Sequence, residues 1–307
     1  MKKNLLLCFD AFGTLFRPRQ SVYKQYGEVA RKYGINGFTD EELATSFKNA
    51  FKEESKLNPN YGRATDLGST RWWTNVIERT FSPFIKGEEK KLPPVLAPAL
   101  LHRFGSKEGY ELCGDAQRLF KKFSDTRPGQ VFRRVDHQEE SMADRRLVVG
   151  VITNSDDRVP DILTSFGLKV KPLRHGEDPR PYHPTNEAAD IDFAIMSYDV
   201  GHEKPDASIF DAATTMLQEL LKAEGHKEAD ISDWRQLYVG DEMEKDAGGA
   251  LTAGWDAVLI DRRDETIFED DGTGVPLPAA RQETRDLGDG RSVVAINDLT
   301  LLSKLIE

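Results

Sequence analysis

The chain has 307 residues, of which 31% are charged and 38% hydrophobic, and its net charge is -10 at pH 7. This length allows roughly two domains with a core each. The acidic balance argues against nucleic acid or an anionic membrane as a partner, because both favour a basic face. Cys8 and Cys113 form neither a disulfide framework nor a zinc-ligand spacing. We therefore expect a protein of the cytoplasm or nucleus, with no secretion signal and no membrane span.

The most informative stretch lies near the start of the chain. Leu5 to Phe9 form an apolar run that ends at Asp10, and Gly13 and Thr14 come directly after. Such a run between turn signals is typical of a buried strand, so Asp10 is expected at the carboxyl end of a strand, where open α/β sheets bind ligands. Taken alone, the same pattern also fits an aspartate that merely caps a turn.

Residues 20–125 have the pattern of one helical module. Apolar residues recur at three- and four-residue spacing over residues 22–33, 39–51 and 71–81, and more weakly over 96–104 and 115–123. Thr39 with Glu42 forms a capping box at the start of the second helix. We predict two domains, an α/β core of residues 1–19 and 126–307 and an inserted helical domain of residues 20–125.

Strand patterns return after the helical module. The sequence predicts strands over 147–153, 193–196, 236–239, 257–260 and 293–296, alternating with helices over 159–166, 207–222 and 299–306. This alternation indicates a mostly parallel sheet with helices on both faces. Residues 171–190 and 261–292 show no such pattern, and we predict that they are long surface loops.

Polar residues follow the predicted strands, and they form a chemically consistent set. In chain order they are Asp10, Thr153-Asn154, Lys204, Asp241 and Asp246. One carboxylate can attack an electrophile, a hydroxyl and an amide can hold the oxygens of a transferred group, and a lysine can balance negative charge. The remaining carboxylates can bind a hard divalent cation. Because three clustered aspartates would repel one another, Mg²⁺ and the lysine are required partners.

The order of these residues resembles the four motifs of the haloacid dehalogenase (HAD) superfamily. The matching positions are Asp10 with Thr14, Thr153, Lys204-Pro205, and Gly240-Asp241 with Asp246. The helical module lies between the first two motifs, where the superfamily carries a C1-type helical cap. Within the superfamily, Asn60-Tyr61-Gly62 and Arg71-Trp72-Trp73 are similar to a segment of the haloacid dehalogenase-like hydrolase domain-containing protein 3 group.

The resemblance implies a HAD-like Rossmannoid core and a hydrolase that acts on a small phosphorylated molecule. Asp10 is then the nucleophile, and Mg²⁺ is held by Asp10, the main-chain carbonyl of Phe12 and Asp241. Asp246 is expected at the metal site, where it positions Lys204 or a metal-bound water. Thr153, Asn154 and Lys204 are expected to bind the phosphoryl group.

Phe12 departs from the phosphatase pattern. Phosphatases of the superfamily place a second aspartate two residues after the nucleophile, and its acid-base help is worth about 10²- to 10⁴-fold in rate. Residues 10–16 also resemble the L-2-haloacid dehalogenase branch, whose halide leaving group needs no proton. Those enzymes need no metal and usually lack the acidic fourth motif, which Asp241 and Asp246 supply here. The alternatives to a weak phosphatase are therefore a 2-haloacid dehalogenase and a catalytically degenerate binding protein.

Overall fold

The computed structural model describes residues 4–85, 91–126, 146–176, 189–223, 231–262 and 280–306. Within these residues the strands are β1 (Asn4–Phe9), β2 (Phe16–Pro18), β3 (Tyr110–Leu112), β4 (Leu147–Thr153), β5 (Phe193–Met196), β6 (Trp234–Gly240), β7 (Asp256–Ile260), β8 (Gln282–Asp286) and β9 (Ser292–Ile296). The α-helices are α1 (Val22–Lys32), α2 (Asp40–Leu57), α3 (Ser69–Phe81), α4 (Leu96–Arg103), α5 (Gly114–Thr126), α6 (Val159–Ser165), α7 (Ser197–Val200), α8 (Ala207–Ala223), α9 (Gly249–Thr252) and α10 (Leu302–Leu305). The 3₁₀ helices are η1 (Asn60–Thr65), η2 (Ser82–Phe84) and η5 (Leu299–Leu301), and η4 (Met243–Gly248) is a π-helix.

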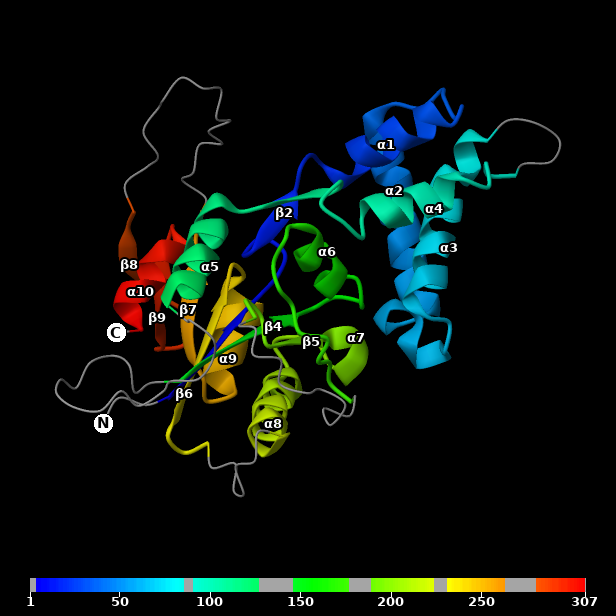
Figure 1. Cartoon of the computed structure of the whole chain (residues 1–307). Helices are drawn as coiled ribbons and strands as arrows, with labels where there is room; N and C mark the ends of the chain where they lie inside the picture. Colours follow the sequence, from blue (N-terminus) through cyan, green and yellow to red (C-terminus); the bar gives the residue numbers. More distant parts are fainter. Residues whose placement is uncertain are drawn as a thin grey trace.

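In the described part of the chain, the main sheet has the strand order β5-β4-β1-β6-β7-β9-β8. Every neighbouring pair in it is parallel except β8 with β9. Helices cover both faces of this sheet, with α8 and α9 on one side and α5, α6 and α10 on the other (Figure 1). The predicted α/β class with a mostly parallel sheet is confirmed.

Strand β1 occupies the middle of the sheet because both of its faces are apolar. Leu5, Leu7 and Phe9 are buried in the core on the α5 and α6 side, while Leu6 and Cys8 are buried in the core on the α8 side. A strand that is buried on both faces reads as a continuous apolar run rather than as an alternating one. The run that precedes Asp10 is therefore the signature of a central parallel strand.

Helices α1 to α4 stand together to the side of the sheet (Figure 1). The capping box at the start of α2 is present, since the Thr39 hydroxyl accepts from the main-chain N–H of Glu42 and the Glu42 carboxylate accepts from that of Thr39. Strands β2 and β3, which join this group to the sheet, pair antiparallel with each other. Helix α5 follows β3 and packs on the sheet, where the rings of Phe120 and Phe9 lie 6.0 Å apart.

The prediction of a loop over residues 261–292 is wrong for residues 282–286, which form β8. This strand is polar throughout, and its side chains are exposed or half-buried. A sheet-edge strand of this kind carries no apolar alternation, so only its main-chain pairing with β9 reveals it. The remaining residues 263–279 of that prediction lie outside the described residues.

The predicted surface loop over residues 171–190 is also corrected in part. Leu173 is buried in the core, and Lys171 forms a buried ion pair with Asp192 (2.7 Å between Nζ and Oδ1). Periodicity does not reveal this segment because its sheet contacts are single bridges, Val170 with Ile191 and Arg174 with Ala194. Residues 177–188 lie outside the described part.

No helix among the described residues is long and apolar enough to cross a membrane.

Candidate active site

Three neighbouring strands deliver polar residues to one edge of the sheet. Phe9 lies opposite Val151 of β4 and Val239 of β6, so Asp10, Thr153 and Asp241 follow at the carboxyl ends of parallel strands. Asp10 is 7% exposed and Thr153 is 1% exposed. The parallel register therefore explains why residues far apart in the sequence meet at this edge.

Lys204 reaches into this edge from the segment between α7 and α8. Its Nζ lies 2.6 Å from Asp10 Oδ1, 2.7 Å from Asp246 Oδ1 and 2.8 Å from the Tyr238 hydroxyl oxygen. The Tyr238 hydroxyl donates to the main-chain oxygen of Ile152 (2.7 Å), so it accepts from the lysine. An ammonium group has three N–H donors, and each has an acceptor here.

Asp246 is tied to Lys204 by its position in η4. One carboxylate oxygen accepts from the lysine, and the other accepts from the main-chain N–H of Glu242 (2.8 Å). Gly240 allows this close approach, because a Cβ at that position would lie 2.3 Å from Asp246 Cγ. The glycine of the Gly-Asp motif thus makes room for the second aspartate of the same motif.

Asp241 lies against the loop that follows β1. The Thr14 hydroxyl donates to its Oδ1 at 3.4 Å. Gly13 has φ +79°, and a Cβ there would lie 2.2 Å from Asp241 Oδ2, so both the backbone conformation and the space require glycine. Asp241 itself is exposed, and one carboxylate oxygen each of Asp10, Asp241 and Asp246 lie within 4.8 Å of one another.

The electrostatics of the cluster favour a cation. Burial raises the pKa of Asp10 to about 6, Lys204 opposes this shift, and Asp246 and Asp241 add to it. Burial also raises the pKa of Asp241, and Asp246 raises it further. Burial lowers the pKa of Lys204, but Asp10 and Asp246 raise it, and the net shift is upward. One ammonium faces three carboxylates, and this oxygen-rich, negatively charged donor set fits Mg²⁺.

Asn154 supports the lysine segment with its side chain. Its Nδ2 donates to the main-chain oxygen of Lys204 (2.9 Å), and its Oδ1 accepts from the main-chain N–H of Lys204 (2.7 Å). These reciprocal bonds fix the segment after β4 to the segment that carries the lysine. Asn154 and Lys204, which the sequence predicts to share one site, therefore lie together.

Phe12 faces other aromatic rings. Its ring centroid lies 4.7 Å from that of Phe16 and 5.6 Å from that of Tyr110, both in edge-to-face arrangements. Phe16 and Tyr110 are buried ends of β2 and β3. The position at which the phosphatase pattern predicts a second aspartate is therefore part of an apolar cluster next to the strands that lead to α1–α4.

The helical group contacts the residues after β4. Trp73 of α3 donates from Nε1 to Asp156 Oδ2 (2.5 Å), and Ser69 donates to Asp157 Oδ1 (2.5 Å). Arg158 pairs with Asp156 and lies over the Trp73 ring, with its Cζ 4.4 Å from the ring centroid. The helices α1–α4 are thus docked beside the strand-end residues.

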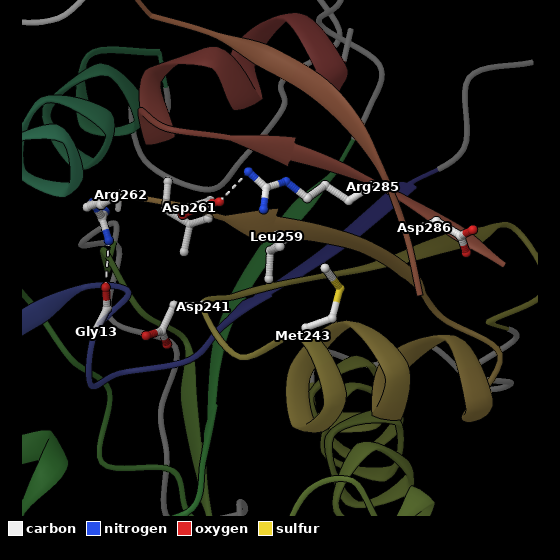
Figure 2. A pocket seen from close by; sticks show the side chains of 9 residues that line it. Gly13, Asp241, Met243, Leu259, Asp261, Arg262, Arg285 and Asp286 are labelled. Atoms are coloured by element: carbon white, nitrogen blue, oxygen red, sulfur yellow. Dashed lines mark hydrogen bonds and ion pairs between the residues drawn. The ribbon is translucent and has the colours of Figure 1, made fainter. Parts of the chain in front are cut away.

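Two residues near the cluster do not stand out in the sequence. Tyr238 lies inside β6, and only the folded structure shows that its hydroxyl contacts Lys204 and the main-chain oxygen of Ile152. Arg262 follows β7 and could have been noticed by the strand-end rule that identified Asp10. With Gly13, Asp241 and Met243 it lines a cavity of about 590 Å³, shown in Figure 2.

Known proteins resemble this chain along most of its length. No family model matches the sequence. An uncharacterized hydrolase of Schizosaccharomyces pombe is 29% identical over 261 residues, which cover 85% of this chain and 92% of the yeast protein. The haloacid dehalogenase-like hydrolase domain-containing protein 3 of Danio rerio is 28% identical over 256 residues, or 83% of this chain and 84% of the fish protein.

The fold has a solved counterpart as well. A 2-haloacid dehalogenase from Pseudomonas syringae superposes with a TM-score of 0.51 at 16% sequence identity, covering 99% of this chain and 98% of the bacterial chain. The sequence relatives and the fold agree, and together with the strand-end aspartate and lysine they support a HAD-like hydrolase. Within that superfamily the chain is related to the haloacid dehalogenase-like hydrolase domain-containing protein 3 group.

Proposed function

We propose that this HAD-like hydrolase is a Mg²⁺-dependent phosphatase-type enzyme that acts on a small phosphorylated metabolite through Asp10. The observation that carries the proposal is the carboxylate cluster, in which Asp10 and the exposed Asp241 lie within 4.8 Å of each other beside a single ammonium group. A dehalogenase of this architecture has no need of such an excess of negative charge. A phosphate-transferring enzyme uses it to hold a divalent cation.

Each residue has a role in the proposed reaction. An Asp10 oxygen forms a bond to phosphorus while the bond from phosphorus to the leaving oxygen breaks, which gives an aspartyl-phosphate that water then hydrolyses. Asp10, Asp241 and the Phe12 main-chain carbonyl would hold Mg²⁺, which when bound neutralises charge on the transferred group. Thr153 would hydrogen-bond the phosphoryl oxygens, with the Asn154 amide nearby.

Lys204 contributes a fixed positive charge in this proposal. Its three N–H groups already contact Asp10, Asp246 and Tyr238, so the lysine screens the nucleophile and the incoming phosphate. Asp246 holds the lysine at the metal site, because one of its oxygens accepts from Lys204 and the other from the main-chain N–H of Glu242. The helices α1–α4 within residues 20–125 act as a cap over this site.

Phe12 favours a second candidate, a 2-haloacid dehalogenase. Its ring packs against Phe16 and Tyr110, and a phenyl ring at this position cannot protonate a leaving alcohol. A halide leaves without a proton, so this apolar wall suits carbon–halogen cleavage as well as it suits a slow phosphatase. The two candidates share Asp10 as nucleophile and differ in their need for Mg²⁺.

A parallel assay separates the candidates. Purified protein is incubated with p-nitrophenyl phosphate, other phosphate esters and 2-chloropropionate, with and without Mg²⁺, and Asp10→Asn serves as the blank. We expect slow phosphate release that requires both Mg²⁺ and Asp10. Chloride release without Mg²⁺ would establish the dehalogenase instead, and activity that survives in Asp10→Asn would refute both. Release of neither product would indicate a binding protein.

Substitution of Phe12 tests the missing proton transfer. In Phe12→Asp the phosphatase rate should rise by about 10²-fold or more, because general acid-base help returns at the position where phosphatases carry it. Phe12→Asn is the matched control, since it has the same shape as aspartate but cannot donate or accept the proton in this way. Equal rates in the two variants would contradict the assignment of Phe12 as the missing group.

A further inference from the structure

Arg262 contacts the loop that follows the nucleophile Asp10. Its Nη1 donates to the main-chain oxygen of Gly13 (2.6 Å), and its Nη2 donates to the main-chain oxygen of Thr14 (2.9 Å). Figure 2 shows the first of these bonds, with Asp241 on the other side of Gly13. The Arg262 side chain is 13% exposed. Two consecutive peptide groups of this loop are therefore held by one side chain.

Asp115 holds the arginine in place. Its Oδ2 lies 2.7 Å from Arg262 Nη2 and also accepts from the main-chain N–H of Leu299 (3.0 Å), while its Oδ1 accepts from the N–H of Ala116 (2.9 Å). The carboxylate is 6% exposed and lies in the first turn of α5. Buried ion pairs with this many hydrogen bonds fix geometry well, because each oxygen is committed.

The arginine also lies at the base of both connections to α1–α4. Thr14 precedes β2 and Asp115 follows β3, and the N–H of Cys113 donates to the oxygen of Leu15 (2.9 Å). Strands β2 and β3 pair directly beyond this point. The bonds of Arg262 therefore join the loop between β1 and β2 to the first turn of α5, which follows β3.

The loop has little freedom on its other side. Gly13 sits against the Asp241 carboxylate so closely that a Cβ would overlap it, and Thr14 contacts the same carboxylate. A shift of the Gly13 peptide would therefore move the loop after Asp10 relative to the Asp241 carboxylate. A side chain that fixes the Gly13 peptide also fixes the distance between this loop and Asp241.

We propose that Arg262, held by Asp115, is a positioning residue that sets the loop after Asp10 against Asp241 and links this arrangement to the paired strands β2 and β3. The pair touches no reacting atom. It acts through the main-chain oxygens of Gly13 and Thr14, which lie next to the Phe12 carbonyl. The expected effect of Arg262 on Mg²⁺ binding rests on the proposed function, whereas the expected effect of Arg262 on the order of the loop does not.

The test compares Arg262→Met with Arg262→Lys and uses Arg118→Met as the matched control. Arg118 also joins α5 to the C-terminal segment through an ion pair, with Asp298 (2.7 Å), but it lies away from the loop. Amide hydrogen exchange of residues 11–16 is measured in the full chain without metal, alongside exchange in β4 and β6. Calorimetric titration with Mg²⁺ alone gives the metal affinity.

In Arg262→Met we expect exchange over residues 11–16 to be at least about tenfold faster while β4 and β6 stay protected, and Mg²⁺ affinity to fall by about tenfold. Arg262→Lys should recover part of both, and Arg118→Met should change neither. Asp115→Asn, which keeps the hydrogen bond from the N–H of Ala116, should show a smaller increase in exchange over residues 11–16 than Arg262→Met. Unchanged exchange over residues 11–16, or an increase equal to that in β4 and β6, overturns the inference.

The two proposals fail in different ways. If the unmodified protein binds no Mg²⁺ but Arg262→Met still loosens residues 11–16, the metal-dependent function is wrong and the positioning role stands. If the unmodified protein binds Mg²⁺ and Arg262→Met binds it equally well with unchanged exchange, the metal site stands and the positioning role is wrong.

Discussion

The hydroxyl of Tyr238 offers a direct measure of what holds Lys204 in place. In Tyr238→Phe the ring keeps its edge-to-face contact with Phe210, at 5.2 Å between centroids, so little packing changes. The lost oxygen leaves one N–H of a buried ammonium without its acceptor and removes the donor to the Ile152 carbonyl. A bond to a charged group is worth about 1.5–3 kcal/mol and a neutral one about 1 kcal/mol, so the free energy of unfolding should fall by about 2–4 kcal/mol.

Urea unfolding followed by tryptophan fluorescence measures this loss, without metal and at neutral pH. Tyr110→Phe is the matched control, because Tyr110 is also buried, yet within the described part of the chain its hydroxyl makes no hydrogen bond to a charged group and feels the Arg158–Asp156 ion pair only through its charge. We expect the control to lose less than half as much stability as Tyr238→Phe. The reasoning fails if Tyr238→Phe unfolds at the same urea concentration as the unmodified protein, or if the two variants lose the same amount.

Two further predictions concern the loop and the nucleophile. Gly13→Ala should lower the free energy of unfolding by about 2 kcal/mol or more and weaken Mg²⁺ binding. Gly34→Ala is the control, because Gly34 has a similar positive φ but no atom within 4 Å of a Cβ built there, so this variant should show only the backbone strain. Denaturant unfolding and calorimetry measure both effects, and equal effects in the two variants would mean that the contact with Asp241 is unimportant. Because burial raises the pKa of Asp10 to about 6, Mg²⁺ must displace a proton from Asp10 below pH 6. The Mg²⁺ affinity should therefore fall by about tenfold per pH unit below pH 6 and be constant above pH 6. Calorimetry that shows constant affinity from about pH 7.5 to about pH 5 would contradict this expectation.

The sheet and the meeting of the site residues could be predicted because both depend on local patterns. A continuous apolar run indicates a strand buried on both faces, and parallel neighbours place their carboxyl ends at one edge. Asp10, Thr153 and Asp241 each end such a run, so their proximity is a result of the register alone. Lys204 comes from the segment before α8, and its positive charge and the resemblance to a known superfamily placed it with the others.

The residues that escaped prediction act through contacts that no pattern encodes. Strand β8 is polar because it forms the sheet edge, so it lacks the alternation that marks a strand. Tyr238 occupies a strand position where any apolar residue would also fit, and its role depends on the reach of its hydroxyl to Lys204. Arg262 follows β7, so the strand-end rule could have drawn attention to it, but its bonds to main-chain oxygens of a segment nearly the whole chain away cannot be read from the sequence.

The pairing of β2 with β3 has a consequence for how such a protein can change. The chain leaves for α1–α4 at Phe16–Pro18 and comes back at Tyr110–Leu112, on two strands that lie side by side. Topologically, the helices are an insertion into a hairpin. Lengthening, shortening or exchanging them leaves the order and register of the main sheet untouched. Selection can therefore remodel these helices without changing the strand order of the part that carries Asp10.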